Sequence, residues 1–129
     1  MHGITRTELS ECELVAMKCI WDMDGAAPCK DVMDRMREAY GMDYKITTVY
    51  TLLTKLAEKG FVRQERMSGK VSFYEAECSQ EEYMFRELEL IRDFWFSGST
   101  AAFIKSLVTE LEMTEKEKKE VMAILREQV

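Results

Sequence analysis

The sequence predicts a mainly α-helical fold that carries a small β-hairpin and falls into two parts. Ser or Thr followed three residues later by Glu predicts a helix start at Ser10, Ser79 and Thr114, and an apolar run at helical spacing follows each of them. Residues 61–74 show a hairpin pattern around a Ser-Gly turn. Beyond Cys78 the sequence changes to acidic and apolar helical patterns without a strand, which predicts two domains, residues 1–78 and 79–129.

The first two predicted helices have recognisable start and stop signals. The first follows Ser10 and is expected to end near the turn at residues 22–25. Pro28 suits the opening turn of a second helix, Cys29–Tyr40, and Gly41 is expected to end it. The residues expected to face the core are Leu14, Met17 and Trp21 of the first helix, flanked by Val15 and Ile20, and Val32, Met33 and Met36 of the second.

A third helix is predicted at about residues 47–59, and the hairpin follows it. Its core-facing residues, at helical spacing, are Val49, Leu52, Leu53 and Leu56. The side chains that then point away from the core are Thr47, Tyr50, Thr51 and Thr54, with Thr48 and Lys55 at the flanks. Gly60 is suited to end the helix, Phe61 and Val62 open a strand, and the returning strand is expected at Lys70–Tyr74.

The third helix and the hairpin are basic within an acidic chain. Residues 45–74 contain six Lys or Arg and two Glu, a net charge of +4, whereas the whole chain of 129 residues has a net charge of −6. Positive charge concentrated on one element attracts phosphates locally, although the overall field would repel them. Two helices, a third helix with a hydroxyl-rich face and then a basic hairpin are typical of a winged helix-turn-helix that binds DNA.

In such a fold the third helix enters the major groove and the wing lies along the adjacent backbone. The residues expected to contact double-stranded DNA are Thr47, Thr48, Tyr50, Thr51, Thr54, Lys55, Arg63, Arg66 and Lys70. Thr can donate to phosphates or touch a thymine methyl group, whereas the bidentate base-binding residues Arg, Asn and Gln are missing from this helix face. Specificity would then come partly from methyl contacts and from DNA shape.

The C-terminal part has more apolar surface than one helical hairpin normally buries. Met84, Leu88, Ile91 and Trp95 form one stripe that neighbouring aromatic residues widen, and two further apolar faces follow the break at residues 97–99. With no sheet to cover these faces, a second copy of the chain is the expected partner, and a monomeric core is the alternative. The predicted homodimer interface comprises Leu88, Ile91, Phe94, Trp95, Phe103, Leu107, Val108, Val121 and Leu125.

Other interpretations of the same features stay open. In one alternative to DNA binding, the polar face of the third helix only contacts water. In another, the charged hairpin prevents aggregation between exposed strand edges. In a different functional class, the winged helix would be a protein-interaction module, which the acidic overall charge favours. Cys12 and Cys19 lie seven residues apart, near one helix face, and would allow a thiol- or metal-responsive sensor. Reduced, structural cysteines are the simpler interpretation.

The sequence argues against an enzyme. The only His is His2, and a Gly-rich phosphate loop and a G-x-S-x-G nucleophile motif are absent. We expect no catalytic residue, no cofactor and no metal site, because several His ligands and any C-x-x-C pairing are lacking. No stretch approaches the ~20 apolar residues of a membrane span, and the N-terminus lacks the apolar core of a secretion signal, so we expect no membrane partner and a cytoplasmic location.

Several short motifs, in one order over nearly the whole chain, resemble the penicillinase-repressor family, the BlaI, MecI and CopY type of transcriptional regulators. The opening helix of that family is similar to residues Leu9 to Trp21. Its recognition helix is similar to Thr48 to Leu56, followed by Lys59-Gly60. Its wing is similar to the stretch from Gly69-Lys70 to Phe73-Tyr74. Its dimerisation region is similar to Phe96 to Ser99, Leu107-Val108 and Thr114 to Glu117. The shared order makes the resemblance far more specific than any one motif.

The resemblance implies a homodimeric repressor that covers a palindromic operator and releases it on a signal. It also implies that Thr48, Tyr50 and Thr51 lie in the groove-contacting part of the helix. The chain departs from the family where the signal acts. Members that control β-lactam resistance are cleaved after an Asn, and this sequence contains no Asn; copper-responsive members carry a C-terminal Cys-x-Cys motif, and no Cys follows Cys78. Neither induction route is carried over, and the sequence identifies no upstream sensor, operator or regulated gene.

Overall fold

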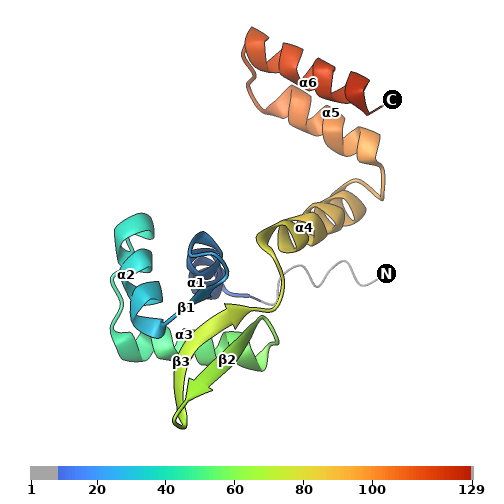
Figure 1. Ribbon diagram of the computed structural model, residues 1–129. Coiled ribbons are helices and arrows are strands. Elements are labelled where there is room, and N and C mark those ends of the chain that lie inside the picture. Colours follow the sequence, from blue (N-terminus) through green and yellow to red (C-terminus); the bar gives the residue numbers. More distant parts are fainter. Residues whose placement is uncertain (1–8, 129) are drawn as a thin grey trace. The chain divides into compact units, whose positions relative to one another are not determined.

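The computed structural model describes residues 9–128, without the side chains of Met67, Val71 and Ser72, so that His2 lies outside the described residues. Six helices and a three-stranded sheet occur in this part of the chain (Figure 1). In chain order the elements are α1 (Glu11–Asp22), β1 (Ala26–Ala27), α2 (Cys29–Tyr40), α3 (Ile46–Glu58), β2 (Val62–Met67), β3 (Lys70–Ala76), α4 (Gln80–Trp95), α5 (Thr100–Glu110) and α6 (Glu115–Glu127). The predicted fold class, mainly α with a small hairpin wing, is confirmed.

The described residues form two compact units, one ending at Glu87 and the next beginning at Leu88, so the division falls within α4. Tyr83, in the first half of α4, is only 7% exposed. Its ring packs against Trp21 and Phe61, with centroid distances of 5.6 and 6.0 Å. The first turns of α4 therefore belong to the first unit, and a boundary between two domains at residue 78 stays a prediction.

Local signals in the sequence set the ends of the helices. At the start of α1, Ser10 N–H donates to the Glu13 carboxylate (2.7 Å) and Glu13 N–H donates to Ser10 Oγ (3.2 Å). The same reciprocal pair forms at the start of α4 and of α6. Gly41 ends α2 with a φ of 68°, a left-handed conformation that costs Gly little. The three predicted capping boxes and the predicted span of α2 are confirmed.

The sheet has the strand order β1-β3-β2, and both pairs are antiparallel. β2 and β3 form the predicted hairpin, whose two turn residues, Ser68 and Gly69, have φ values of 53° and 78°, as a tight hairpin turn of this kind requires. β3 continues past Tyr74 to Ala76, and its end also pairs with β1. β1 was not predicted from the sequence, because its two alanines are too few to show the alternation of a strand.

The core of the first unit lies between α1, α2, α3 and the sheet. Most predicted core residues are fully buried there, among them Val32, Met36, Val49, Leu53 and Leu56. α1 differs from the prediction. Its fully buried residues are Ala16, Met17, Cys19 and Ile20, whereas Leu14, Val15 and Trp21 are only partly buried. Because α1 contacts α2, α3 and β3, its buried face takes in small side chains that a pattern of large apolar residues does not include.

One carboxylate is buried in this core. Glu13 is 3% exposed, and its Oε1 accepts hydrogen bonds from Ser10 N (2.7 Å) and Lys59 Nζ (2.8 Å). Burial acts to raise the pKa of Glu13, but the hydrogen bonds from Lys59 and Ser10 outweigh it and hold this pKa below its usual value. Lys59 directly follows α3, so the ion pair joins the beginning of α1 to the end of α3.

The second unit contains the end of α4 together with α5 and α6. Ser99 caps α5 by accepting a hydrogen bond from Ala102 N (3.0 Å), and Phe96 stacks on Phe103 with a centroid distance of 5.2 Å. Neither α5 nor α6 has a buried residue. The apolar faces of both helices are therefore open in the single chain. Among the described helices, none has the length and apolar character needed to cross a bilayer.

Replacing Glu13 by Gln is expected to lower the free energy of unfolding at neutral pH by about 1–3 kcal/mol, because the charged hydrogen bond from Lys59 to this buried position is lost. Urea unfolding followed by circular dichroism measures this change. Glu58→Gln, at the exposed end of α3, is the control and should change stability little.

The pH dependence of the same variant has a defined sign. The folded-state pKa of Glu13 lies below its unfolded value, so its stabilisation is present above the unfolded pKa and is lost as pH falls through the folded pKa. The stability difference between wild type and Glu13→Gln should therefore shrink in acid. A difference that stays constant in acid, or an equal loss for Glu58→Gln, would contradict the assignment.

Candidate nucleic-acid interface

The exposed face of α3 lies opposite its buried face. Val49, Leu53 and Leu56 are 0% exposed, which fixes the rotation of the helix, whereas Tyr50 is 50% exposed. Of the other expected groove-side residues, Thr54 is half-buried and the exposed ones are Thr47, Thr48, Thr51 and Lys55. All six of these side chains thus lie at accessible positions on one helix.

The threonines of this face differ in what their hydroxyl groups bind. Thr51 Oγ1 donates to the carbonyl oxygen of Thr47 (3.0 Å), and Thr54 Oγ1 donates to that of Tyr50 (2.9 Å). Within the described residues, the hydroxyl groups of Thr47 and Thr48 make no hydrogen bond. The hydroxyl groups in the first turn of α3 are therefore free to donate to a ligand, whereas those of Thr51 and Thr54 already donate to carbonyl oxygens of the helix.

The beginnings of α2 and α3 differ from those of the other described helices. A Ser or Thr side chain caps α1, α4, α5 and α6, whereas Pro28 before α2 and Lys45 before α3 make no side-chain cap hydrogen bond. Backbone N–H groups in the first turns of these two helices are therefore available to an outside acceptor, and helix N-termini favour anions. Neither helix start was predicted from the sequence as a site for an anion, although Pro28 and Lys45 at the cap positions were a visible signal.

Two basic residues of the hairpin are accessible and have no ion pair within the part of the chain that the structure describes. Lys70 is exposed, and Arg66 is exposed with its Nη2 donating to Gln64 Oε1 (3.3 Å). Lys55 of α3 is likewise exposed and makes no ion pair there. These three cations have the free charge that a contact with phosphate needs.

Arg63, the third expected wing cation, has a different environment. Its guanidinium contacts the carboxylates of Glu65, Glu75 and Glu77, at 2.5 Å for Glu65 and 3.2 Å for Glu77. The hydrogen bond to Glu65 and the charges of Glu75 and Glu77 hold the pKa of Arg63 above its usual value. This face of the hairpin is therefore net acidic, which the charge count over residues 45–74 did not show because it ends before Glu75 and Glu77.

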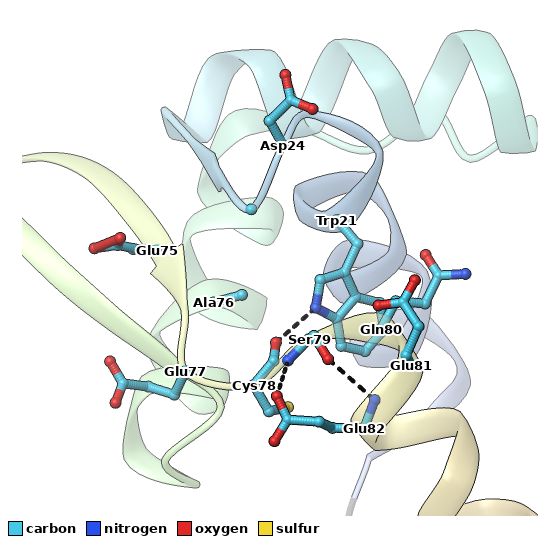
Figure 2. Close-up of a pocket in the computed structure, with 11 residues that line it drawn as sticks. Trp21, Asp24, Glu75, Ala76, Glu77, Cys78, Ser79, Gln80, Glu81 and Glu82 are labelled. Carbon is cyan, nitrogen blue, oxygen red and sulfur yellow. Dashed lines mark hydrogen bonds between the residues drawn. The ribbon is translucent and has the colours of Figure 1, made fainter.

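A cavity of about 450 Å³ lies where β3 leads into α4 (Figure 2). Trp21 lines it, with its Nε1 donating to the Cys78 carbonyl oxygen (2.9 Å), and Ser79 and Glu82 form the cap of α4 beside it. The acidic residues around it are Asp24, Glu75, Glu77, Glu81 and Glu82. An anionic lining of this kind repels phosphate, so we do not include the cavity in the candidate nucleic-acid interface.

The four cysteines are free thiols. Cys12 Sγ lies 3.2 Å from Tyr44 Oη, and Cys19 is 0% exposed. Burial raises the pKa of Cys19 to about 11 and also raises the pKa of Cys29 and Cys78. Among the described residues, no group of His, Cys, Asp and Glu is arranged to hold a metal ion. The sensor alternative therefore has no structural support at Cys19.

Comparisons with known proteins give a family match and structural neighbours. The sequence matches the model of the family described as Penicillinase repressor over residues 9–127. A solved complex of hsRosR-S4 has 13% sequence identity and a TM-score of 0.53, with 97% of this chain and 93% of that chain covered, a likeness of fold alone. The ligand-free organohalide-sensing transcriptional regulator RdhR has 11% identity and a TM-score of 0.48, with 94% of this chain and 62% of that chain covered. No curated protein matched the sequence.

Cys19 is expected to resist alkylation in the native protein at about pH 8, because its thiol is buried and protonated. In urea all four cysteines should react. Peptide mass spectrometry after a short treatment with iodoacetamide measures the modification at each position, with the partly exposed Cys12 as the internal reference. Modification of native Cys19 as fast as that of Cys12 would contradict the buried environment.

Proposed function

The chain belongs to the penicillinase-repressor family of DNA-binding transcriptional regulators, and on this premise we propose that it acts as a homodimeric repressor that binds a palindromic operator. The observation that carries the proposal is the exposed hydroxyl-rich face of α3 beside a hairpin whose Arg66 and Lys70 have no ion pair among the described residues. Each protomer would contact one half-site, and the two half-sites would lie about one helical turn, or a multiple of it, apart.

In the proposed complex α3 lies in the major groove and the hairpin lies along the adjacent backbone. The groove-side residues are Thr47, Thr48, Tyr50, Thr51, Thr54 and Lys55. Arg66 and Lys70 contact phosphates, and the free N–H groups at the beginnings of α2 and α3 donate hydrogen bonds to phosphate oxygens. Arg63 is left out of this set, since its guanidinium already neutralises carboxylates.

Two observations favour DNA over a protein as the partner of this face. The beginnings of α2 and α3 lack side-chain caps, a state that suits phosphate and has no stabilising value in the free protein. The unpaired cations Lys55, Arg66 and Lys70 carry one sign of charge, as the attraction of a polyanion requires. A surface that only contacts water would need neither feature.

The proposed dimer would bury the open apolar faces of the second unit. Of the interface residues predicted from the sequence, those exposed by 40–63% are Leu88, Phe94, Trp95, Leu107, Val108 and Leu125, and those half-buried are Ile91, Phe103 and Val121. A groove of about 440 Å³ between α5 and α6 is lined mainly by such residues, among them Leu107, Val121 and Leu125. Contiguous apolar surface of this kind is rare on a monomer and is typical of an interface. The second unit, from Leu88 onward, would accordingly supply the dimer contacts of the region predicted at residues 79–129.

Affinity for a promoter-length duplex is expected to fall steeply with salt, by a log–log slope of roughly −0.9 for each phosphate neutralised. The physical cause is the release of counterions when Lys and Arg side chains replace them. Fluorescence anisotropy with a labelled duplex, measured over a range of salt concentrations, gives the slope. A protein-interaction module would bind duplex DNA weakly and with little salt dependence, which would contradict the proposal.

Three variants that each remove one positive charge test which side chains of the hairpin contact phosphates. Arg66→Gln and Lys70→Gln should each weaken binding to all sequences similarly and reduce the magnitude of the salt slope by about one. Arg63→Gln is the matched control, because the same charge is removed from a side chain that is paired with carboxylates. An equal effect of all three variants would mean that net charge alone, rather than the accessible wing cations, sets the affinity.

Leu107→Glu is expected to convert the dimer to a monomer at micromolar concentration, since a charge would be buried at the interface without a partner. Analytical ultracentrifugation measures the mass, and circular dichroism checks that the helices remain. Thr109→Glu places the same residue elsewhere on the exposed surface of α5 and should leave the mass unchanged. A wild-type protein that sediments as a monomer would contradict the proposed dimer.

A further inference from the structure

Two threonines in the middle of α3 have no proton to give to a base. A Thr hydroxyl carries one proton, and in Thr51 and Thr54 that proton is donated to the carbonyl oxygens of Thr47 and Tyr50, at 3.0 and 2.9 Å. What remains on each side chain is a methyl group and the acceptor lone pairs of an oxygen that is turned toward the helix backbone. The two side chains are therefore more apolar toward the groove than their residue type implies.

Among the neighbours in the middle of the helix, only Tyr50 and Lys55 keep exposed donors that could reach a base edge. The face contains no Arg, Asn or Gln, the side chains that bind guanine or adenine in a bidentate way. Thr47 and Thr48 have free hydroxyl groups, but they lie in the first turn of α3, where an uncapped helix start already suits phosphate. Thr51 and Thr54 recur at helical spacing after Thr47, so they continue the same stripe toward the middle of the helix.

Resting on the proposed function, in which α3 enters the major groove, we propose that Thr51 and Thr54 recognise thymine through their methyl groups. In the major groove the C5-methyl of thymine is the apolar group that distinguishes this base from the other three. Methyl-to-methyl contact leaves intact both hydrogen bonds from the threonine hydroxyl groups to backbone carbonyl oxygens. Recognition by hydroxyl donation would require breaking one of them for each base contacted.

The interpretation predicts an unusual pattern of tolerance at position 51. Valine has the shape of threonine with a second methyl in place of the hydroxyl, so Thr51→Val should keep sequence preference. Serine keeps the hydroxyl and lacks the methyl, so Thr51→Ser should lose that preference. A residue that used its hydroxyl to contact a base would show the reverse order.

The experiment uses the full chain and a duplex selected from a random pool by the wild-type protein. Each thymine of the selected site is replaced in turn by uracil, which removes only the C5-methyl. At one or two positions of a half-site the dissociation constant should rise roughly three- to ten-fold for wild type and for Thr51→Val, as expected for a lost buried methyl contact. For Thr51→Ser at least one of these uracil effects should disappear, because the protein methyl that met the base methyl is gone.

Thr109 provides a matched control in α5. Its Oγ1 also donates to the carbonyl oxygen four residues earlier, that of Lys105 (2.9 Å), and the residue lies outside the proposed DNA-contacting face. Thr109→Val and Thr109→Ser should leave both the affinity and the uracil effects unchanged, which separates loss of a contact from a general response of helices to these substitutions.

Three results would overturn the inference. The first is that uracil is tolerated at every position, and the second is that the selected site has no defined thymine. The third is that Thr51→Ser keeps the uracil effect while Thr51→Val loses it. Each would contradict methyl recognition while DNA binding persisted. Failure of wild type to bind any duplex at low salt would instead contradict the proposed function itself. The two failures are therefore distinguishable.

Discussion

The ion pair between Glu13 and Lys59 joins the beginning of α1 to the end of α3 in the DNA-binding unit. Glu13 serves the beginning of α1 through its hydrogen bond with Ser10 and the end of α3 through Lys59, and it does so at 3% exposure. A buried carboxylate is costly unless its partners are in place, so the pair fixes one relative position of the two helices. α3 can present a defined face to a ligand only because its other face and its end are held in this way.

The charges of the molecule follow a spatial pattern that their sum does not reveal. Lys55, Arg66 and Lys70 are accessible and unpaired among the described residues, whereas Arg63 is surrounded by three carboxylates on the same hairpin. The cavity between β3 and α4 is also lined by carboxylates. An acidic protein can therefore present a small cationic surface to a polyanion while neighbouring surfaces repel it, which favours one orientation of approach.

Features set by neighbours in sequence were predictable, and features set by distant residues were not. The capping boxes at Ser10, Ser79 and Thr114, the end of α2 at Gly41 and the hairpin turn depend on residues a few positions apart, and the structure confirms them. β1, the rotation of α1 in the core and the Glu13–Lys59 pair depend on contacts across the fold. The candidate site divides likewise: the polar face of α3 follows from helical periodicity, whereas the pairing of Arg63 with Glu75 and Glu77 requires the register of β2 with β3. The DNA contacts themselves stay predictions.

Hydrogen exchange of the full chain, with and without a duplex selected from a random pool, tests the central claim that α3 and the hairpin form the DNA-binding surface. Peptides from the first turns of α2 and α3 and from the hairpin should exchange more slowly when DNA is bound, because phosphates would occupy free N–H groups there and the hairpin would be held against the backbone. Peptides from residues 77–82, which line the acidic cavity beyond the hairpin, should exchange at the same rate in both states. Protection centred on residues 77–82, with α3 unchanged, would contradict the claim.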